Sequence, residues 1–257
     1  MGRLVAIALN TFREAVRDRI LYGIVFFGVA FLLFNLVLGE LSLHQEERVL
    51  TDVGLAGISI VSVVIAVFLG VSLLYKEIER KTLYTVLPKP VRRWEFMLGK
   101  FLGLVATLAV QVALMGAVLA SLMTLKGIPV RAHLLGSLCL VFLEVTLVSS
   151  VALFFSSFST PFVSGVLTLG VFVVGRILDV LEEFASHASP AARTVADVVV
   201  AVAPNFYLYA PGYGTLATAV PGLEPALYLA KVAGYTLVYA TILVATASFV
   251  FSRRDLV

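Results

Sequence analysis

Residues 53–75 read VGLAGISIVSVVIAVFLGVSLLY and carry no charged side chain. A helix of this length extends about 34 Å, and the hydrocarbon core of a bilayer is about 30 Å thick. The run is therefore long and apolar enough to cross a membrane, and it predicts a transmembrane helix around which the rest of the chain can be interpreted.

The composition of the whole chain extends this interpretation. Of its 257 residues 60% are hydrophobic and 14% are charged, whereas a soluble domain averages about 45–50% apolar and about 25% charged residues. These values exclude a soluble globule and a disordered chain. The single cysteine, Cys139, also excludes a secreted scaffold built on disulfides. We expect an all-α polytopic membrane protein made of a single transmembrane domain over residues 1–257.

Five further segments have the length and the apolar character of a membrane span: 21–39, 101–125, 134–156, 162–181 and 232–252. A turn is expected between the fourth and fifth of the six spans, at residues 156–161, because small polar residues before a proline favour turns. Residues 198–220 are also uncharged, but prolines and glycines interrupt them. We expect short helices there, within an outer loop over residues 182–225.

The distribution of basic residues predicts the orientation. With six spans, both termini share one side, and that side holds 13 of the 19 Lys and Arg residues. The positive-inside rule makes it cytoplasmic. The net charge of +3 lies in clusters between apolar blocks, which is typical of a protein held in a lipid bilayer and argues against a nucleic-acid partner. We expect a bacterial-type inner membrane.

Two segments outside the spans have helical patterns. In residues 1–18, Val5, Leu9, Phe12 and Val16 recur at helical spacing, which predicts an amphipathic interfacial helix. Residues 76–100 are densely charged, with apolar residues at helical spacing up to a Pro-Lys-Pro stop. The second segment is interpreted either as a docking helix or as a solvated loop that only obeys the positive-inside rule, and we favour docking.

Residues 79–100 read ERKTLYTVLPKPVRRWEFMLGK. This stretch resembles the permease subunits of ABC-2 type transporters, in which an acidic residue, Gly-Thr, a leucine-rich turn, Pro-Val-Ser/Arg-Arg and Gly-Lys follow in order. Lys81 stands where that family has glycine. The end of the chain, FSRRDL at residues 251–256, is also similar. The likeness covers nearly the whole chain, and the sequence is similar to the NosY-like branch.

The resemblance implies a type V exporter-like fold and an exporter driven by a separate cytoplasmic ABC ATPase. It also implies a second permease copy or a paralogue, and it leaves room for an accessory protein on the outer side. The coupling helix that docks on the ATPase would use Glu79, Arg80, Thr82, Leu83 and Leu87. The chain lacks the Gly-x-x-x-x-Gly-Lys-Ser/Thr phosphate loop, since Phe101 follows Gly99-Lys100. We therefore expect no enzyme and no cofactor in this chain, with ATP and Mg²⁺ bound by the partner.

Glu144 lies near the middle of the expected fourth span. A charge at that depth costs about 2.5–3.5 kcal/mol on insertion scales, so it should face the bundle or a cavity. Two interpretations remain open: a pathway or gating contact, or a structural carboxyl bonded to Gln111 or Asn35. Arg176 and Asp179 are expected to form a local ion pair. The three histidines are scattered over three loops, which predicts no metal site.

Gly99-x-x-x-Gly103 could bring two helix backbones close together, although the pattern is weakly specific. Two other classes of function are kept open beside the ATP-driven permease. One is an ATP-independent secondary transporter or channel, which would favour internal repeats and charged midplane residues. The other is a membrane scaffold for an enzyme assembly.

Overall fold

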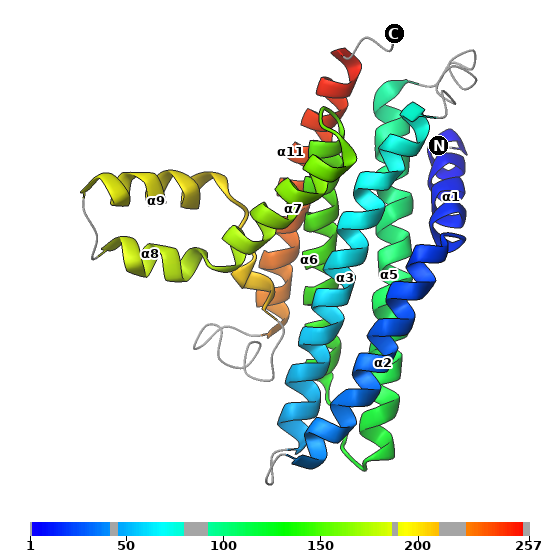
Figure 1. Cartoon of the computed structure of the whole chain (residues 1–257), viewed down its shortest axis with the longest axis vertical. Helices are drawn as coiled ribbons and strands as arrows, with labels where there is room; N and C mark the ends of the chain where they lie inside the picture. Colours follow the sequence, from blue (N-terminus) through cyan, green and yellow to red (C-terminus); the bar gives the residue numbers. More distant parts are fainter. Residues whose placement is uncertain (1, 42–45, 80–91, 187–189, 211–224, 254–257) are drawn as a thin grey trace.

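The computed structural model describes residues 2–41, 46–79, 92–186, 190–210 and 225–253, and within these ranges it contains helices and no strands (Figure 1). The elements are α1 (Gly2–Val16), α2 (Arg19–Leu41), α3 (Glu46–Glu79), α5 (Arg93–Leu125), α6 (Ala132–Ser156), α7 (Pro161–Arg176), α8 (Leu178–Ser186), α9 (Pro190–Val202), the 3₁₀ turn η1 (Tyr207–Tyr209) and α11 (Pro225–Arg253). Within the described ranges, α2, α3, α5, α6 and α11 are long and apolar enough to span a membrane, and the bent pair α7–α8 adds a sixth span if it counts as one.

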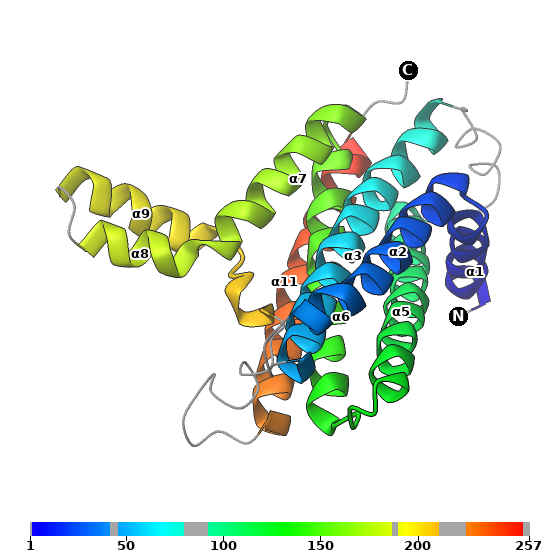
Figure 2. The ribbon, with the colours of Figure 1, turned by 60° about the horizontal axis from the view of Figure 1, so that its bottom comes forward.

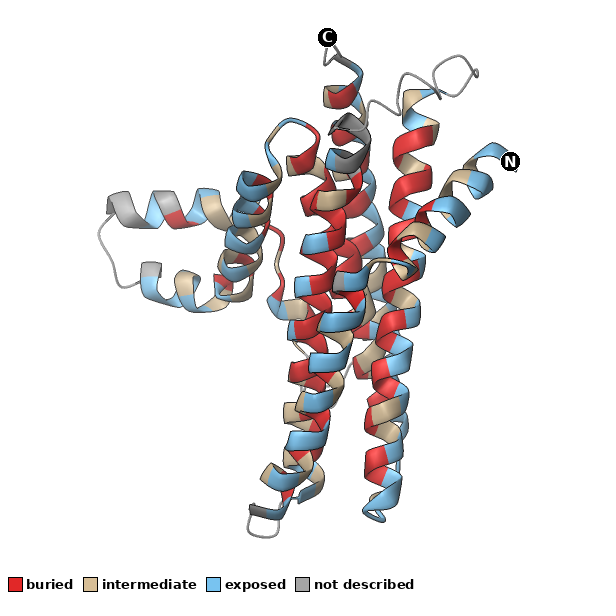
Figure 3. Ribbon diagram, turned by 45° about the vertical axis from the view of Figure 1, so that its right-hand side comes forward, coloured by how far each residue is buried: buried red, intermediate tan, exposed pale blue. Residues whose placement is uncertain are grey.

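The bundle is organised around α6. This helix packs against α3, α5, α7 and α11, while α2 lies on the outside against α3 and α5 (Figures 1 and 2). Buried residues follow the facing sides of the central helices, and pale exposed residues dominate the outer helices (Figure 3). The apolar residues exposed on α2, α7 and α11 are those expected of surfaces that meet lipid or other membrane helices.

The predicted fifth span, 162–181, is not one straight helix. It breaks at Ile177 into α7 and α8, whose axes differ by 59°. Because α7 has 16 residues, it is about 24 Å long and falls short of a core about 30 Å thick. The helices α8 and α9 pack on each other as a hairpin that projects sideways from the bundle (Figures 1 and 3).

Turn chemistry sets the two described connections around α6. Gly127, just after α5, has a φ of 72°, a left-handed conformation that favours glycine and ends the helix. At the other end, α6 stops at Ser156 and Pro161 is the first residue of α7, because proline is well suited to the first helical position. The turn expected at residues 156–161 is thus confirmed.

The helix α1 packs along the first part of α5 and runs in the same direction. A Cβ atom on Gly99 would lie 2.7 Å from Ile7, and one on Gly103 would lie 2.5 Å from the carbonyl oxygen of Ala8. The Gly-x-x-x-Gly spacing therefore does bring two helix backbones together. The apolar residues Val5 and Leu9 of α1 remain exposed, which leaves them free to contact lipid.

The spans flanking the predicted 76–100 segment are longer than expected. The helix α3 continues to Glu79 and α5 already begins at Arg93. At about 51 Å and about 50 Å, both exceed the hydrocarbon thickness and extend past it toward the connecting residues 80–91. Those residues themselves lie outside the described ranges.

Replacing Gly103 with alanine should loosen α1 from α5. The added methyl would overlap the Ala8 carbonyl and the Thr11 side chain, and overpacking of this kind costs about 1–3 kcal/mol. We expect a lower thermal unfolding midpoint in detergent and faster proteolysis within α1. Gly23→Ala is the matched control, because no atom lies within 4 Å of its added Cβ. Equal behaviour of the two variants would contradict this packing.

Candidate functional site

Glu144 lies halfway along α6, and its side chain is fully buried. The Ser59 hydroxyl of α3 donates a hydrogen bond to its Oε2 atom at 2.6 Å. Nη1 of Arg176, the last residue of α7, donates to Oε1 at 2.7 Å. One carboxylate therefore joins three helices in the interior of the bundle.

This arrangement corrects two expectations about the buried charges. Neither Gln111 nor Asn35 bonds to Glu144; its charge is balanced by Arg176, which comes 32 positions later in the sequence. The expected local pair of Arg176 with Asp179 is replaced by this long-range pair. An ionised acid at this depth is costly alone, and an arginine in direct contact offsets much of that cost.

Arg176 also closes the base of the α8–α9 hairpin. The same Nη1 atom donates to the carbonyl oxygen of Phe206 at 3.1 Å, and the Phe206 backbone N–H donates to the Gly175 carbonyl at 2.9 Å. The end of α7 and the segment around Phe206, by which the chain returns to the bundle, are thus held side by side. We call Glu144, Gly175, Arg176 and Phe206 the clasp.

Gly175 allows this close approach. A Cβ atom at this position would lie 2.2 Å from the carbonyl oxygen of Pro204 and 2.6 Å from the Phe206 ring. Contacts this short do not occur, so any side chain would push the returning segment away from α7. The clasp therefore requires glycine beside its arginine.

The aromatic residues around Phe206 are not all at the surface. Phe206 and Tyr209 are fully buried, whereas Tyr207 is exposed. Three tyrosines of α11 hold the returning segment through backbone hydrogen bonds at 2.6–3.0 Å: Tyr228 with Leu208, Tyr235 with Asn205 and Tyr239 with Val202. Neither the regular spacing nor the composition of this segment indicated that α11 would cover it.

A second polar contact lies one helical turn from Ser59. The Gln111 side chain of α5 donates to the Ser62 hydroxyl at 3.1 Å. Ser59 and Ser62 are three residues apart on α3, so the polar contacts of α7, α6, α3 and α5 lie within one helical turn of each other, and we call them the polar layer. Asn35 lies apart from it and donates to the Leu50 carbonyl at 2.9 Å.

Two buried side-chain oxygens, one in the polar layer and one outside it, lack hydrogen-bond partners among the described residues. They are Oε1 of Gln111 and Oδ1 of Asn35, both buried. Buried polar atoms are normally satisfied, so each is a candidate contact for a polar group that enters the bundle. In the described ranges, no three His, Cys, Asp or Glu side chains gather into a metal-binding group.

The residues predicted to dock on an ATPase fall at the edge of the structure or beyond it. Glu79 is the last residue of α3, and Arg80, Thr82, Leu83 and Leu87 lie outside the described residues. The other flank of this segment, the start of α5, is described and firmly held. There the Arg93 guanidinium donates to the carbonyls of Phe251 and Ser252 at the end of α11, at 3.1 and 2.9 Å.

Lys100 joins the start of α5 to α1, on the side away from the α11 contact of Arg93. Its side chain is only 2% exposed, and its ammonium lies 3.5 Å from the Glu14 carboxylate of α1. The same ammonium stands 5.7 Å above the Phe96 ring centre, within the range of a cation–π contact. The helix that leaves residues 80–91 is thus tied to both α1 and α11.

Comparison with known proteins identifies the family. The family described as "ABC-2 family transporter protein" matches residues 5–256, so the chain belongs to the ABC-2 transporter family. No curated protein matches the sequence. The chain is a multi-pass membrane protein, and its family is a transport component that is not itself catalytic, generally works with a cytoplasmic ATPase and often dimerises.

Breaking the clasp at Arg176 should destabilise the bundle strongly. Arg176→Gln leaves the Glu144 carboxylate buried without its cation, which typically costs about 3–5 kcal/mol. The double variant Glu144→Gln/Arg176→Gln removes both charges, so we expect it to lose less stability than the sum of the single variants. Unfolding midpoints in detergent for the four proteins of this cycle would measure the coupling.

Arg48→Gln is the control for the loss of an arginine. Arg48 pairs with Asp52 on the surface of α3, and exposed pairs of this kind contribute about 0.5 kcal/mol or less. Strictly additive effects of Glu144→Gln and Arg176→Gln would contradict the clasp.

Proposed function

We propose that this member of the ABC-2 family is the permease subunit of an ATP-driven exporter and that a separate cytoplasmic ATPase subunit drives it. The observation that carries the proposal is the charged, helix-patterned segment between the second and third spans, in a chain without a phosphate-binding loop. Because the nucleotide is bound on another polypeptide, a permease needs a segment that docks on that polypeptide. We call this segment, residues 76–100, the handle.

The flanking helices are suited to transmit a movement of that handle. Each of α3 and α5 is a single continuous helix longer than the membrane is thick. The start of α5 is fixed to α1 and α11 by Lys100 and Arg93, so a force on residues 80–91 would move packed helices together. In our proposal, ATP binding closes two ATPase subunits, each moves the coupling helix it grips, and α3 and α5 tilt as levers.

The polar layer gives these levers a contact at the centre of the bundle. Ser59 and Ser62 of α3 bond to Glu144 and Gln111. Tilting α3 would strain the Ser59–Glu144 bond and, through Arg176, the base of the α8–α9 hairpin. We propose Glu144 as a gating residue, with Gln111 and Asn35 as polar contacts along the pathway.

A second permease copy, or a paralogue, is the proposed membrane partner. The charges of the hairpin support this proposal. The hairpin leaves the bundle beside Arg176, at the level of the middle of α6, and Glu182 and Asp197 on it are exposed. Each acid would cost about 2.5–3.5 kcal/mol in hydrocarbon, so protein or a water-filled pathway should surround the hairpin.

The finer assignments follow from the same proposal. ATP and Mg²⁺ would be bound by the ATPase subunit, and no cofactor is proposed for this chain. The location would be a bacterial-type inner membrane with both termini cytoplasmic, with room for an outer-side accessory protein. Membership of the NosY-like branch is proposed on the similarity of residues 79–100 and 251–256 and on the layout of the chain.

Acidic substitutions in the handle should uncouple the permease from the ATPase subunit. We expect Arg80→Glu and Leu83→Asp to abolish co-purification of the ATPase, or ATP-driven transport, while the amount of protein in the membrane stays normal. Arg48→Glu, at the other end of α3, is the matched control and should have no effect. Unchanged coupling in both handle variants would contradict docking, and transport by the isolated chain would favour a secondary transporter.

The orientation can be tested with single cysteines. In a Cys139→Ser background, Arg48→Cys should react with an impermeant thiol reagent added outside the cell. The Lys89→Cys and Arg254→Cys variants should react only after the membrane is opened. Outside labelling at position 89 or 254 would place the handle on the wrong side for a cytoplasmic ATPase.

A further inference from the structure

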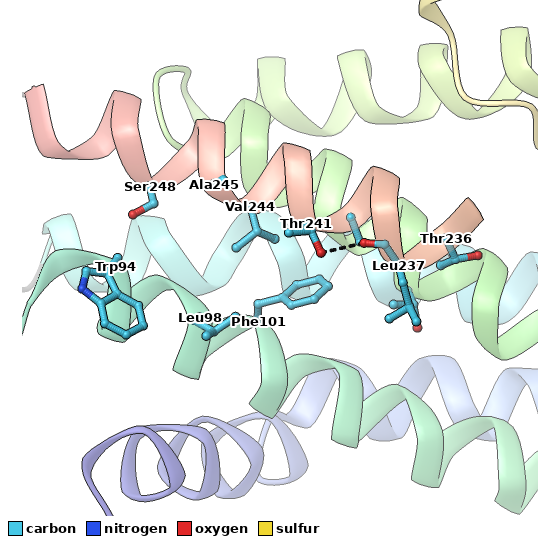
Figure 4. A pocket seen from close by; sticks show the side chains of 11 residues that line it. Trp94, Leu98, Phe101, Thr236, Leu237, Thr241, Val244, Ala245 and Ser248 are labelled. Carbon is cyan, nitrogen blue, oxygen red and sulfur yellow. Dashed lines mark hydrogen bonds between the residues drawn. The ribbon is translucent and has the colours of Figure 1, made fainter. Parts of the chain in front are cut away.

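A groove of about 380 Å³ runs between α5 and α11 (Figure 4). Trp94, Leu98 and Phe101 of α5 form one wall, and α11 forms the other with small side chains such as Thr241, Ala245 and Ser248. The wall of α11 also contains the larger side chains of Leu237 and Val244, and Thr146 of α6 completes the lining. The groove starts beside Trp94 and runs along both helices toward Thr236.

Fixed contacts hold the two walls in place. Arg93 joins the start of α5 to the end of α11 near the Trp94 end. Toward the other end, the Thr236 and Tyr209 hydroxyls are hydrogen-bonded at 2.6 Å. Arg93 therefore fixes the spacing of the two walls at the Trp94 end, while the bond to Tyr209 of η1 holds the α11 wall near the other end.

The lining is suited to an apolar occupant. The hydroxyls of Thr146 and Thr241 donate to carbonyls of their own helices, at 2.8 and 2.6 Å, so they present methyl groups more than free donors. From Thr236 to Ser248 the groove is about 18 Å long, and one leaflet of a core about 30 Å thick measures about 15 Å. One acyl chain of a single leaflet has this length and chemistry.

The mouth of the groove adds charge complementarity. Trp94 is 48% exposed in the first turn of α5, the position of an interfacial aromatic belt. Arg92 is exposed immediately before that turn, and arginine binds phosphate through paired N–H donors. The Glu95 carboxylate accepts a hydrogen bond from the Arg92 backbone N–H at 3.1 Å, so the charge offered to a phosphate at this end is the Arg92 guanidinium.

We propose that this groove binds one acyl chain of an anionic phospholipid, with the lipid phosphate at Arg92. The linings of this groove and of the apolar cavities beside α7, of about 690 and 650 Å³, contain no charged residue. The anionic lipid is assigned to the α5–α11 groove because Trp94 lines it and the exposed Arg92 precedes Trp94 by two residues. The assignment does not depend on how the permease is driven.

The lipid site can be tested by fluorescence, because Trp94 is the only tryptophan in the chain. The full-length protein is reconstituted in phosphatidylcholine vesicles that contain a small fraction of brominated phosphatidylglycerol or, in a parallel sample, brominated phosphatidylcholine. At equal mole fraction, we expect the brominated anionic lipid to quench Trp94 more strongly. Its apparent affinity should be about tenfold higher, since hydrogen bonds to charged groups contribute that much.

Two variants separate the parts of the proposal. Arg92→Gln should remove the preference for the anionic lipid, whereas Arg13→Gln, on the exposed side of α1, should keep it. Ala245→Leu fills the groove and should weaken quenching by both brominated lipids. Ala230→Leu, exposed on α11 outside the groove, is its matched control.

Several results would overturn the proposal. Equal quenching by the two lipids, unaffected by Ala245→Leu, would mean that Trp94 meets only bulk lipid. Absence of quenching by either lipid would mean that protein, such as a second copy, covers the groove. A preference that survives Arg92→Gln would refute the phosphate contact.

Discussion

A membrane interior does not tolerate an isolated charge, and the pairing of Glu144 with Arg176 follows from this constraint. The carboxylate lies in the middle of α6 and its cation ends α7, so the pair fixes the point at which α7 stops. The hairpin then starts at that depth, and Phe206 returns to the same guanidinium. The break in the fifth span thus lies beside the residue that pairs with the buried acid.

The helix α3 connects this central pair to the end of the bundle where an ATPase is proposed to act. It bonds to the clasp through Ser59 and to α5 through Ser62, and it extends past the membrane thickness toward residues 80–91. A change at the handle therefore has a direct physical route to the α8–α9 hairpin. The packing of α5 against α1 and α11 makes the second lever stiff as well.

The spans were largely predictable because each depends on a property of a short stretch of chain. Residues 53–75 lie within α3, residues 134–156 nearly match α6, and the turn before Pro161 falls where small polar residues precede a proline. The close approach at Gly99 and Gly103 was also indicated by their spacing. The helix ends at Glu79 and Arg93 were not, because charged residues can continue a helix beyond the bilayer as readily as they can form a loop.

The sequence by itself determined that this chain is a helical membrane protein, where most of its spans lie and that one acid sits at the centre of the fourth. Only the tertiary structure decided what that acid binds, that Phe206 and Tyr209 are buried beneath α11 and that the fifth span is broken. The physical reason is the distance along the chain over which each interaction acts. Hydrophobic length and turn propensity act within about twenty neighbouring residues, whereas a charge pair in a low-dielectric interior joins residues brought together only by packing.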